Sequence, residues 1–284
     1  MAATTATRRH LVGTALRHYR EQLGYTLDTA ARLLECDQSK VSRIETGQRG
    51  IRSRELRELL EAYGVREEQQ DVLLAIQEST RDITTAWWRG YANVLSGAHL
   101  EYVITEEHAS QVLAYEPLVI PELLQTQDYA QAVALASPDF PAGAEDDAVE
   151  AVRLRQYTVL EERRTNLSVV IGEAALRQQV GDDRLMHEQL LNLAELGNST
   201  WWITIRVLPF SAGIPAVGGC GSCSILRFDA LPALGLVHLG GPANGVCLED
   251  PNDVTAYTQA FTQVQAVTLS PTASLELIQR LANG

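Results

Sequence analysis

Apolar residues recur at helical spacing through the first 79 residues of the chain, in five amphipathic stretches. Gly24 and Gly47 stand where a left-handed residue closes a helix, and Thr26 and Asp37 can cap the helices that follow them. Two short helices joined by a tight turn and followed by supporting helices predict a helix-turn-helix bundle. The five stretches are 8–23, 26–35, 37–46, 52–64 and 67–79.

The third stretch has the pattern of a recognition helix. Val41 and Ile44 are spaced to face inward, which places Gln38, Ser39 and Arg43 on the opposite side. The N-terminal half of a recognition helix meets base edges in the major groove. Gln can bond adenine and Arg can bond guanine, each through two hydrogen bonds, while Ser is more permissive. We therefore predict that these three outward residues contact bases.

Basic side chains around this helix predict contacts to DNA phosphates. Lys40 is the only lysine among 23 basic residues, and it lies in the first turn of the predicted recognition helix. Arg49, Arg52 and Arg54 follow just beyond that helix. Phosphate contacts commonly come from such Lys and Arg side chains. The alternative for Lys40 is a neutral surface residue, but its polar neighbours favour a contact.

Two charged residues of the bundle are expected to serve the fold rather than the DNA. Arg20 and Glu45 both lie on faces that should turn inward. A charge in a buried position needs a partner of opposite sign. We therefore predict a partly buried ion pair between Arg20 and Glu45, joining the first helix to the recognition helix.

The string QSKVSRIETG, residues 38–47, resembles the pattern of the Xre/Cro family of repressors. The resemblance extends over residues 12–64. It implies the same three base-reading residues, together with DNA-backbone contacts from Lys40 and Thr26. The ion pair predicted above is also usual in that family.

Charge is divided between a basic N-terminal segment and an acidic remainder of the chain. Residues 1–57 carry eleven basic and six acidic side chains, a net charge of +5, whereas the whole chain carries −13. The other 227 residues therefore carry −18. This asymmetry is typical of a protein in which one domain meets phosphate and the other does not.

Beyond the bundle the pattern changes to a mixture of strands and helices. Residues 101–117 predict a strand or turn running into a helix, and residues 120–136 predict a helix introduced by proline. Further strands are predicted within 166–176, 200–210, 223–229 and 234–239. Further helices are predicted within 146–164, 182–196, 253–269 and 270–283.

These patterns divide the chain into two domains. The predicted fold class is an all-α helix-turn-helix domain over residues 1–80, followed by a larger α+β (mixed α/β) domain over residues 99–284. The linker over residues 81–98 contains Trp87 and Trp88. We expect these rings to pack at the domain junction; the alternative is stacking on a ligand.

The body also resembles a known family. The strings YEPLVIPELLQTQDYAQAV, VVIGEAALRQQVG and IRVLPF resemble the C-terminal domain of the WhiJ-like regulators, actinobacterial proteins with an Xre-type head. Members of that family are described as antitoxin-like and are often encoded beside a small protein. The resemblance therefore implies a small partner protein encoded nearby.

No motif in the body supplies catalytic chemistry. Cys220 and Cys223 have the spacing of a zinc half-site or a redox pair, but no second half-site follows and Cys223 lies in a predicted strand. Glu106 and Glu107 precede His108, and we interpret this cluster as solvated helix charge. We therefore expect no metal, no cofactor and no enzymatic activity. The alternative is an enzyme of unknown reaction that carries a DNA-binding head.

The sequence as a whole predicts a cytoplasmic, sequence-specific transcription regulator that binds double-stranded DNA. No apolar run approaches the ~20 residues of a membrane-spanning helix, and we expect no signal peptide. One small bundle reads few bases, so a homodimer on a palindromic operator is expected. The body is expected to dimerise and to bind the small partner protein or a small-molecule ligand.

Overall fold

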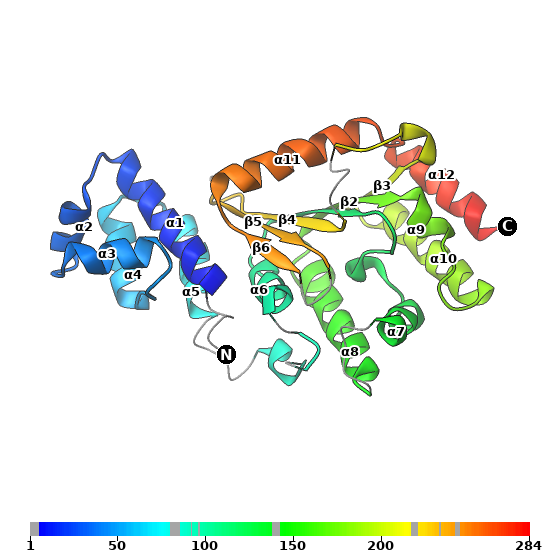
Figure 1. The fold of residues 1–284 in the computed structure, drawn as a ribbon, viewed down its shortest axis with the longest axis horizontal. Helices are drawn as coiled ribbons and strands as arrows, with labels where there is room; N and C mark the ends of the chain where they lie inside the picture. The colour runs from blue at the N-terminus through cyan, green and yellow to red at the C-terminus, as the bar shows by residue number, and fades with distance from the viewer. Residues whose placement is uncertain are drawn as a thin grey trace.

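The computed structural model shows a helical head followed by a mixed body, placed one after the other along the long axis of the molecule (Figure 1). The fold class predicted from the sequence is confirmed. The residues described are 6–79, 86–91, 93–95, 97–137, 143–216, 221–232, 234–241 and 245–284.

The head is a five-helix bundle closed by apolar side chains. Leu11, Leu16 and Ile44 are at most 2% exposed. The helix α1 crosses α3 so closely that a Cβ on Gly13 would lie 2.3 Å from the carbonyl oxygen of Ile44. Glycine is therefore required at this crossing. The helices are α1 (Ala6–Gln22), α2 (Leu27–Leu33), α3 (Gln38–Glu45), α4 (Ser53–Ala62) and α5 (Glu67–Glu78).

The body is built on one mixed six-stranded sheet in the order β3-β2-β1-β4-β5-β6. The strands β1, β2 and β3 run parallel, whereas β4, β5 and β6 pair antiparallel to their neighbours. The strands are β1 (Gln111–Glu116), β2 (Asn166–Gly172), β3 (Ile203–Leu208), β4 (Cys223–Arg227), β5 (Gly235–Leu239) and β6 (Val246–Leu248).

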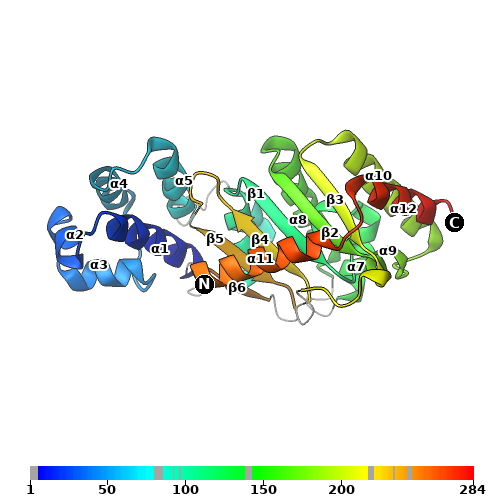
Figure 2. The ribbon, with the colours of Figure 1, turned by 90° about the horizontal axis from the view of Figure 1, so that it is seen from above.

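Helices cover both faces of this sheet. The helix α11 lies across one face, where Phe261 and Val264 pack on Val170 and Val237, and α6 and α8 lie on the other face (Figures 1 and 2). The body helices are α6 (Gly97–Glu106), α7 (Gln127–Ala136), α8 (Glu145–Gln156), α9 (Glu173–Arg177), α10 (Asp183–Ser199), α11 (Pro251–Ala266) and α12 (Pro271–Ala282). Among the described residues, no helix combines the length and the apolar character needed to cross a membrane.

The head and the body share a continuous apolar core. The segment between them includes the short helix Trp87–Tyr91, in which Trp88 is 8% exposed. The indole Nε1 of Trp87 donates a hydrogen bond of 2.8 Å to Glu107 of the body. These rings therefore pack at the junction, as the sequence predicted.

The segment 101–117 differs from its prediction. The sequence predicted a strand or turn before a helix, but the helix α6 comes first and the strand β1 follows it. Val112 to Tyr115 are buried without a break, which is the pattern of a strand covered on both faces rather than of a helix. The strand β6 was not predicted, because its three residues are too short to carry a pattern.

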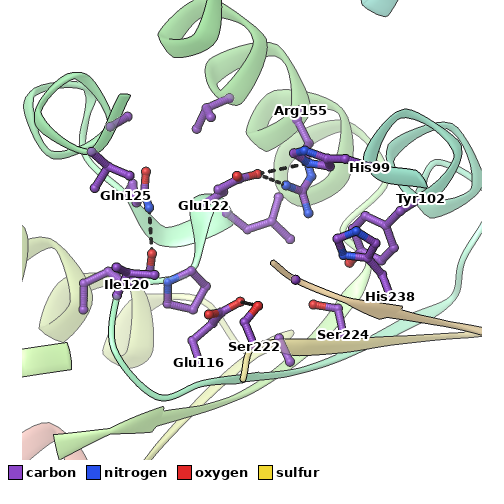
Figure 3. A pocket seen from close by; sticks show the side chains of 18 of the residues that line it. His99, Tyr102, Glu116, Ile120, Glu122, Gln125, Arg155, Ser222, Ser224 and His238 are labelled. Atoms are coloured by element: carbon purple, nitrogen blue, oxygen red, sulfur yellow. Dashed lines mark hydrogen bonds and ion pairs between the residues drawn. The ribbon is translucent and has the colours of Figure 1, made fainter. Parts of the chain in front are cut away.

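The segment 120–136 is also more divided than predicted. Pro121 precedes a single 3₁₀ turn, Glu122–Leu124, and α7 begins only at Gln127. The Thr126 side chain caps α7 by accepting a hydrogen bond from the Tyr129 amide. This division directs the Glu122 side chain toward the interior of the body, as Figure 3 shows.

Candidate functional site

The α3 helix presents the three predicted base-reading side chains to solvent. Val41 and Ile44 are buried, whereas Gln38, Ser39 and Arg43 are exposed. The Arg43 Nε donates a hydrogen bond of 3.0 Å to the Ser39 carbonyl, so its side chain lies back along the helix. The helices α2 and α3 lie on the side of the head away from the body (Figures 1 and 2). That position leaves the α3 face open to a partner.

Four of the predicted phosphate-contacting residues are exposed around α3. Thr26 caps α2, and its Oγ1 accepts a hydrogen bond of 3.1 Å from the Thr29 amide. Arg54 forms an exposed ion pair with Glu58, and such pairs contribute at most about 1 kcal/mol. The remaining two are Arg49 and Arg52.

Lys40 is held in an ion pair that the sequence did not predict. Its Nζ lies 2.6 Å from Glu55 Oε1 on α4, and its side chain is only 18% exposed. Partial burial by itself would raise the pKa of Glu55, but the hydrogen bonds from Lys40 and from the Arg52 amide lower it. A phosphate contact by Lys40 would have to share or replace this ion pair.

Arg20 and Glu45 form the buried ion pair predicted from the sequence. Arg20 Nε lies 2.7 Å from Glu45 Oε1, and Nη2 lies 2.9 Å from Oε2. Arg20 Nη1 also donates to the Tyr25 carbonyl at 2.7 Å. The pair joins the end of α1 to the end of α3, so it fixes the orientation of the exposed α3 face.

A cavity of about 490 Å³ opens in the body beneath α6 and α8. Its walls come from these helices, from the segment between β1 and α7, and from the ends of β4 and β5 (Figure 3). The volume lies within the roughly 300–1,000 Å³ of small-molecule sites. Apolar side chains such as Val119, Ile120 and Val133 line much of it.

Arg155 lies at the wall of this cavity with its charge already neutralised. Its Nε and Nη2 lie 2.6 Å and 2.9 Å from the two carboxylate oxygens of Glu106, and its Nη1 contacts Glu122. The guanidinium carbon lies 5.3 Å from the centre of the Tyr102 ring. The pKa of Arg155 is raised: burial alone would lower it, but Glu106 and Glu122 outweigh that effect.

Glu122 reaches into the cavity between Arg155 and His99. His99 Nε2 lies 3.5 Å from Glu122 Oε2. Burial alone would raise the pKa of Glu122, but His99 and Arg155 lower it below its usual range, so the group is ionised. The ring of His238 stacks on the rings of His99 and Tyr102, with distances between ring centres of 5.7 Å and 4.9 Å. Together these side chains form one polar wall.

Glu116 forms the opposite polar wall. It is the last residue of β1, and its Oε1 accepts a hydrogen bond of 2.8 Å from Ser222 Oγ. Burial raises the pKa of Glu116 to about 8. The carboxyl group is therefore mostly protonated at neutral pH. Figure 3 shows Glu116 and Glu122 on different sides of the same hollow.

The acidic cluster at 106–108 was interpreted wrongly from the sequence. Glu106 is fully buried and pairs with Arg155, so it is not solvated helix charge. His108 is half-buried, and this desolvation lowers its pKa to about 4. The missed signal was the helical spacing of Tyr102 and Glu106, which puts both on the face of α6 that meets Arg155.

The cysteines do not form a metal site in the described part of the chain. Cys223 is buried on β4, and Cys220 lies outside the described residues. No group of three or more His, Cys, Asp or Glu side chains arranged to hold a metal ion occurs among the residues described.

The α6 helix connects the cavity to the head. Its residues His99 and Tyr102 line the cavity, and Glu101 forms a buried two-point ion pair with Arg8 of α1. Arg8 Nε lies 3.1 Å and Nη2 lies 3.2 Å from the Glu101 oxygens, and Nη1 donates to Ser79 Oγ at 3.1 Å. The helix α1 also contacts α3 through the Arg20–Glu45 pair. Two ion pairs, Glu101–Arg8 and Arg20–Glu45, therefore connect the cavity wall to α3 through α1.

Comparisons with known families match both halves of the chain. Residues 11–73 match a helix-turn-helix domain. Residues 100–280 match a domain of unknown function (DUF5753). No curated protein and no solved structure matches the chain.

Proposed function

The chain belongs to the DUF5753 family, and we propose that it is a sequence-specific transcription regulator whose body controls a DNA-binding head. The match to a helix-turn-helix domain supports DNA binding. We assign DNA binding to residues 1–80, the linker to residues 81–98, and control of the head to residues 99–284.

The observation that carries this proposal is the exposed face of α3. Gln38, Ser39 and Arg43 face solvent on a helix whose other side is fixed by Val41 and Ile44. In a helix-turn-helix protein the first residues of the recognition helix meet the base edges. The exposed residues around this face, Thr26, Arg49, Arg52 and Arg54, would contact the phosphates on either side.

We further propose that the protein binds as a homodimer of the Xre type to a palindromic operator. A two-turn recognition helix contacts only a few base pairs, so two heads about 34–36 Å apart are needed for selectivity. The acidic body is the part of the chain left free to dimerise, because its charge disfavours contact with DNA.

The body is proposed to bind a ligand that changes the behaviour of the head. The WhiJ-like resemblance favours a small partner protein, whereas the cavity of about 490 Å³ favours a small molecule. The link from the cavity through Glu101 and Arg8 to α1 supports control of the head in either case. Coupling of this kind requires the ligand to bind two arrangements of head and body with different affinity.

Arg43→Ala is expected to remove the sequence preference of the protein at one base-pair position of each half-site. A lost two-point contact to guanine costs about 1–3 kcal/mol of discrimination at one position. Selection from a random DNA pool should give an inverted repeat with the wild-type protein and a degenerate position with the variant. Arg43→Lys, which keeps the charge, should retain general affinity and weaken this preference. An unchanged consensus in both variants would exclude Arg43 as a base contact.

Lys40→Ala is expected to weaken binding to all DNA sequences and to reduce the slope of log affinity against log salt by about one. The matched variant is Glu55→Gln, which releases Lys40 from its ion pair and should leave the slope unchanged or steeper. Binding assays over a range of salt concentrations measure both slopes. If Lys40→Ala leaves the slope unchanged, Lys40 only joins α3 to α4.

A further inference from the structure

We propose that the cavity of the body binds an organic cation: an amine with an apolar, planar or compact body, held between Glu122 and Glu116. This inference rests on the proposed ligand-binding role of the body and does not depend on how the head reads DNA.

The charges on the cavity wall exclude an anion as the preferred ligand. Arg155 is the only arginine or lysine among the described residues that line the cavity, and Glu106 and Glu122 already neutralise it. The three groups together carry a charge of −1, before any proton on His99. A carboxylate or phosphate would meet Glu122 without a free cation to receive it, and like charges at short range repel. An ammonium group would find a partner.

Glu116 provides a second acceptor for the same cation. Among the described residues, Glu116 forms no ion pair. Its carboxyl group accepts a hydrogen bond from Ser222. An ammonium group placed between Glu116 and Glu122 would favour the ionised form of Glu116 and release its proton. The ammonium group of the ligand would thereby replace the proton of Glu116. This exchange would account for a desolvated carboxyl group that forms no ion pair among the described residues.

The remaining walls accommodate an apolar ligand body. Val119, Ile120 and Val133 line the cavity, and Figure 3 shows Ile120 across it from the stacked rings of Tyr102 and His238. Leu118 and Val119 also line the cavity and are 58% and 38% exposed, so this part of its wall reaches solvent. Aromatic rings of this kind can stack on a planar group or face a cation.

The test uses three probes of the same shape that differ in charge: phenethylamine, phenethyl alcohol and hydrocinnamate. Calorimetric titration of the full-length protein in the absence of DNA measures each affinity. Phenethylamine is expected to bind at least about tenfold more tightly than the other two, because only it pairs with a carboxylate. Preference for hydrocinnamate would overturn the ligand class while leaving a ligand-binding body. Failure of all three at millimolar concentration would overturn the cavity as a small-molecule site and leave a partner protein as the proposed ligand of the body, and neither result bears on DNA binding.

The variant Glu116→Gln distinguishes the contribution of Glu116 to amine binding from that of Glu122. In the wild type, phenethylamine affinity is expected to rise about tenfold between roughly pH 6 and pH 8.5, as Glu116 loses its proton. Two charged groups, Glu122 and Arg155, face Glu116 across the cavity, and Tyr129 of α7 is a titratable group near it. On the neighbouring strands, Glu116 lies beside Ile171 of β2 and Ser222 just before β4, and neither of these is charged. Protons on His99 or His238 would also repel the amine, so the variant provides the necessary control.

Each variant result decides one part of the proposal. Glu116→Gln should flatten the pH dependence and leave the affinity for phenethyl alcohol unchanged, which shows an intact cavity. Glu122→Gln removes the net negative charge of this wall and frees Nη1 of Arg155, while Glu106 still pairs with Nε and Nη2, so it should weaken phenethylamine binding and reduce its advantage over hydrocinnamate. If phenethylamine affinity keeps its full pH dependence in Glu116→Gln, Glu116 does not contact the ligand. If Glu122→Gln leaves the preference among the probes unchanged, the amine does not bind in this cavity.

Discussion

Arg8→Ala is expected to destabilise the protein by about 3–5 kcal/mol, because Glu101 would stay buried without a cation. Glu101 is 2% exposed, and its pKa is already raised by burial, an effect that Arg8 only partly offsets. Removal of the guanidinium leaves the full desolvation cost of that carboxylate. Urea unfolding at neutral pH, followed by circular dichroism, measures the loss.

Two further variants distinguish this pair from ordinary surface charge. Arg17→Ala removes an arginine of the same helix whose pair with Glu21 is exposed, so it should cost no more than about 1 kcal/mol. Arg8→Met combined with Glu101→Leu removes both charges and should recover most of the stability. Equal losses in Arg8→Ala and Arg17→Ala would mean that the pair does not hold the head on the body.

The same double variant tests how the body controls the head. If α6 transmits ligand binding to α1 through Glu101 and Arg8, the double variant should bind both ligand and operator while losing the effect of one on the other. The two affinities then become independent. The exposed α3 face is not touched by the change, so any altered response arises from the link.

The sequence predicted most of what local rules determine. The inward positions of α3 follow from the spacing of Val41 and Ile44 alone, and the Arg20–Glu45 pair follows from two charges on inward faces. The strand β2 was predicted because a buried parallel strand is a continuous apolar run. In these cases the information lies within a few residues of the element concerned.

The cavity could not be predicted in this way, because its residues come from distant segments. Glu106 and Arg155 are 49 positions apart, and Glu116 and Ser222 are 106 positions apart. Their pairing depends on the contact between α6 and α8 and on the pairing of β1 with β4, which no local pattern determines. A buried carboxylate and a solvated one look the same in sequence, so Glu106 was misjudged.

Glu116→Gln is expected to stabilise the protein increasingly as the pH rises. In the folded protein the pKa of Glu116 is about 8, against an ordinary value of 4.5. Between these two values the folded protein retains a proton that the unfolded chain has lost, so the wild-type stability contributed by this group declines as the pH rises. Each pH unit corresponds to ~1.4 kcal/mol, giving a total of about 4 kcal/mol by pH 8. Glutamine has no proton to lose and escapes this decline.

The melting-temperature difference between Glu116→Gln and wild type should therefore be small near pH 4.5 and reach about 10 °C near pH 8. Taking the difference cancels the other titrating groups that the two proteins share. Glu122→Gln should instead be less stable than wild type by a constant amount over this range, because the pKa of Glu122 is lowered in the folded protein and its pH-dependent contribution lies below the ordinary carboxyl pKa. A difference that grows with pH in Glu116→Gln alone therefore places the buried proton on Glu116. If the Glu116→Gln difference stays constant from pH 4.5 to pH 8, Glu116 is already ionised in the folded protein, and an entering amine would have no proton to displace.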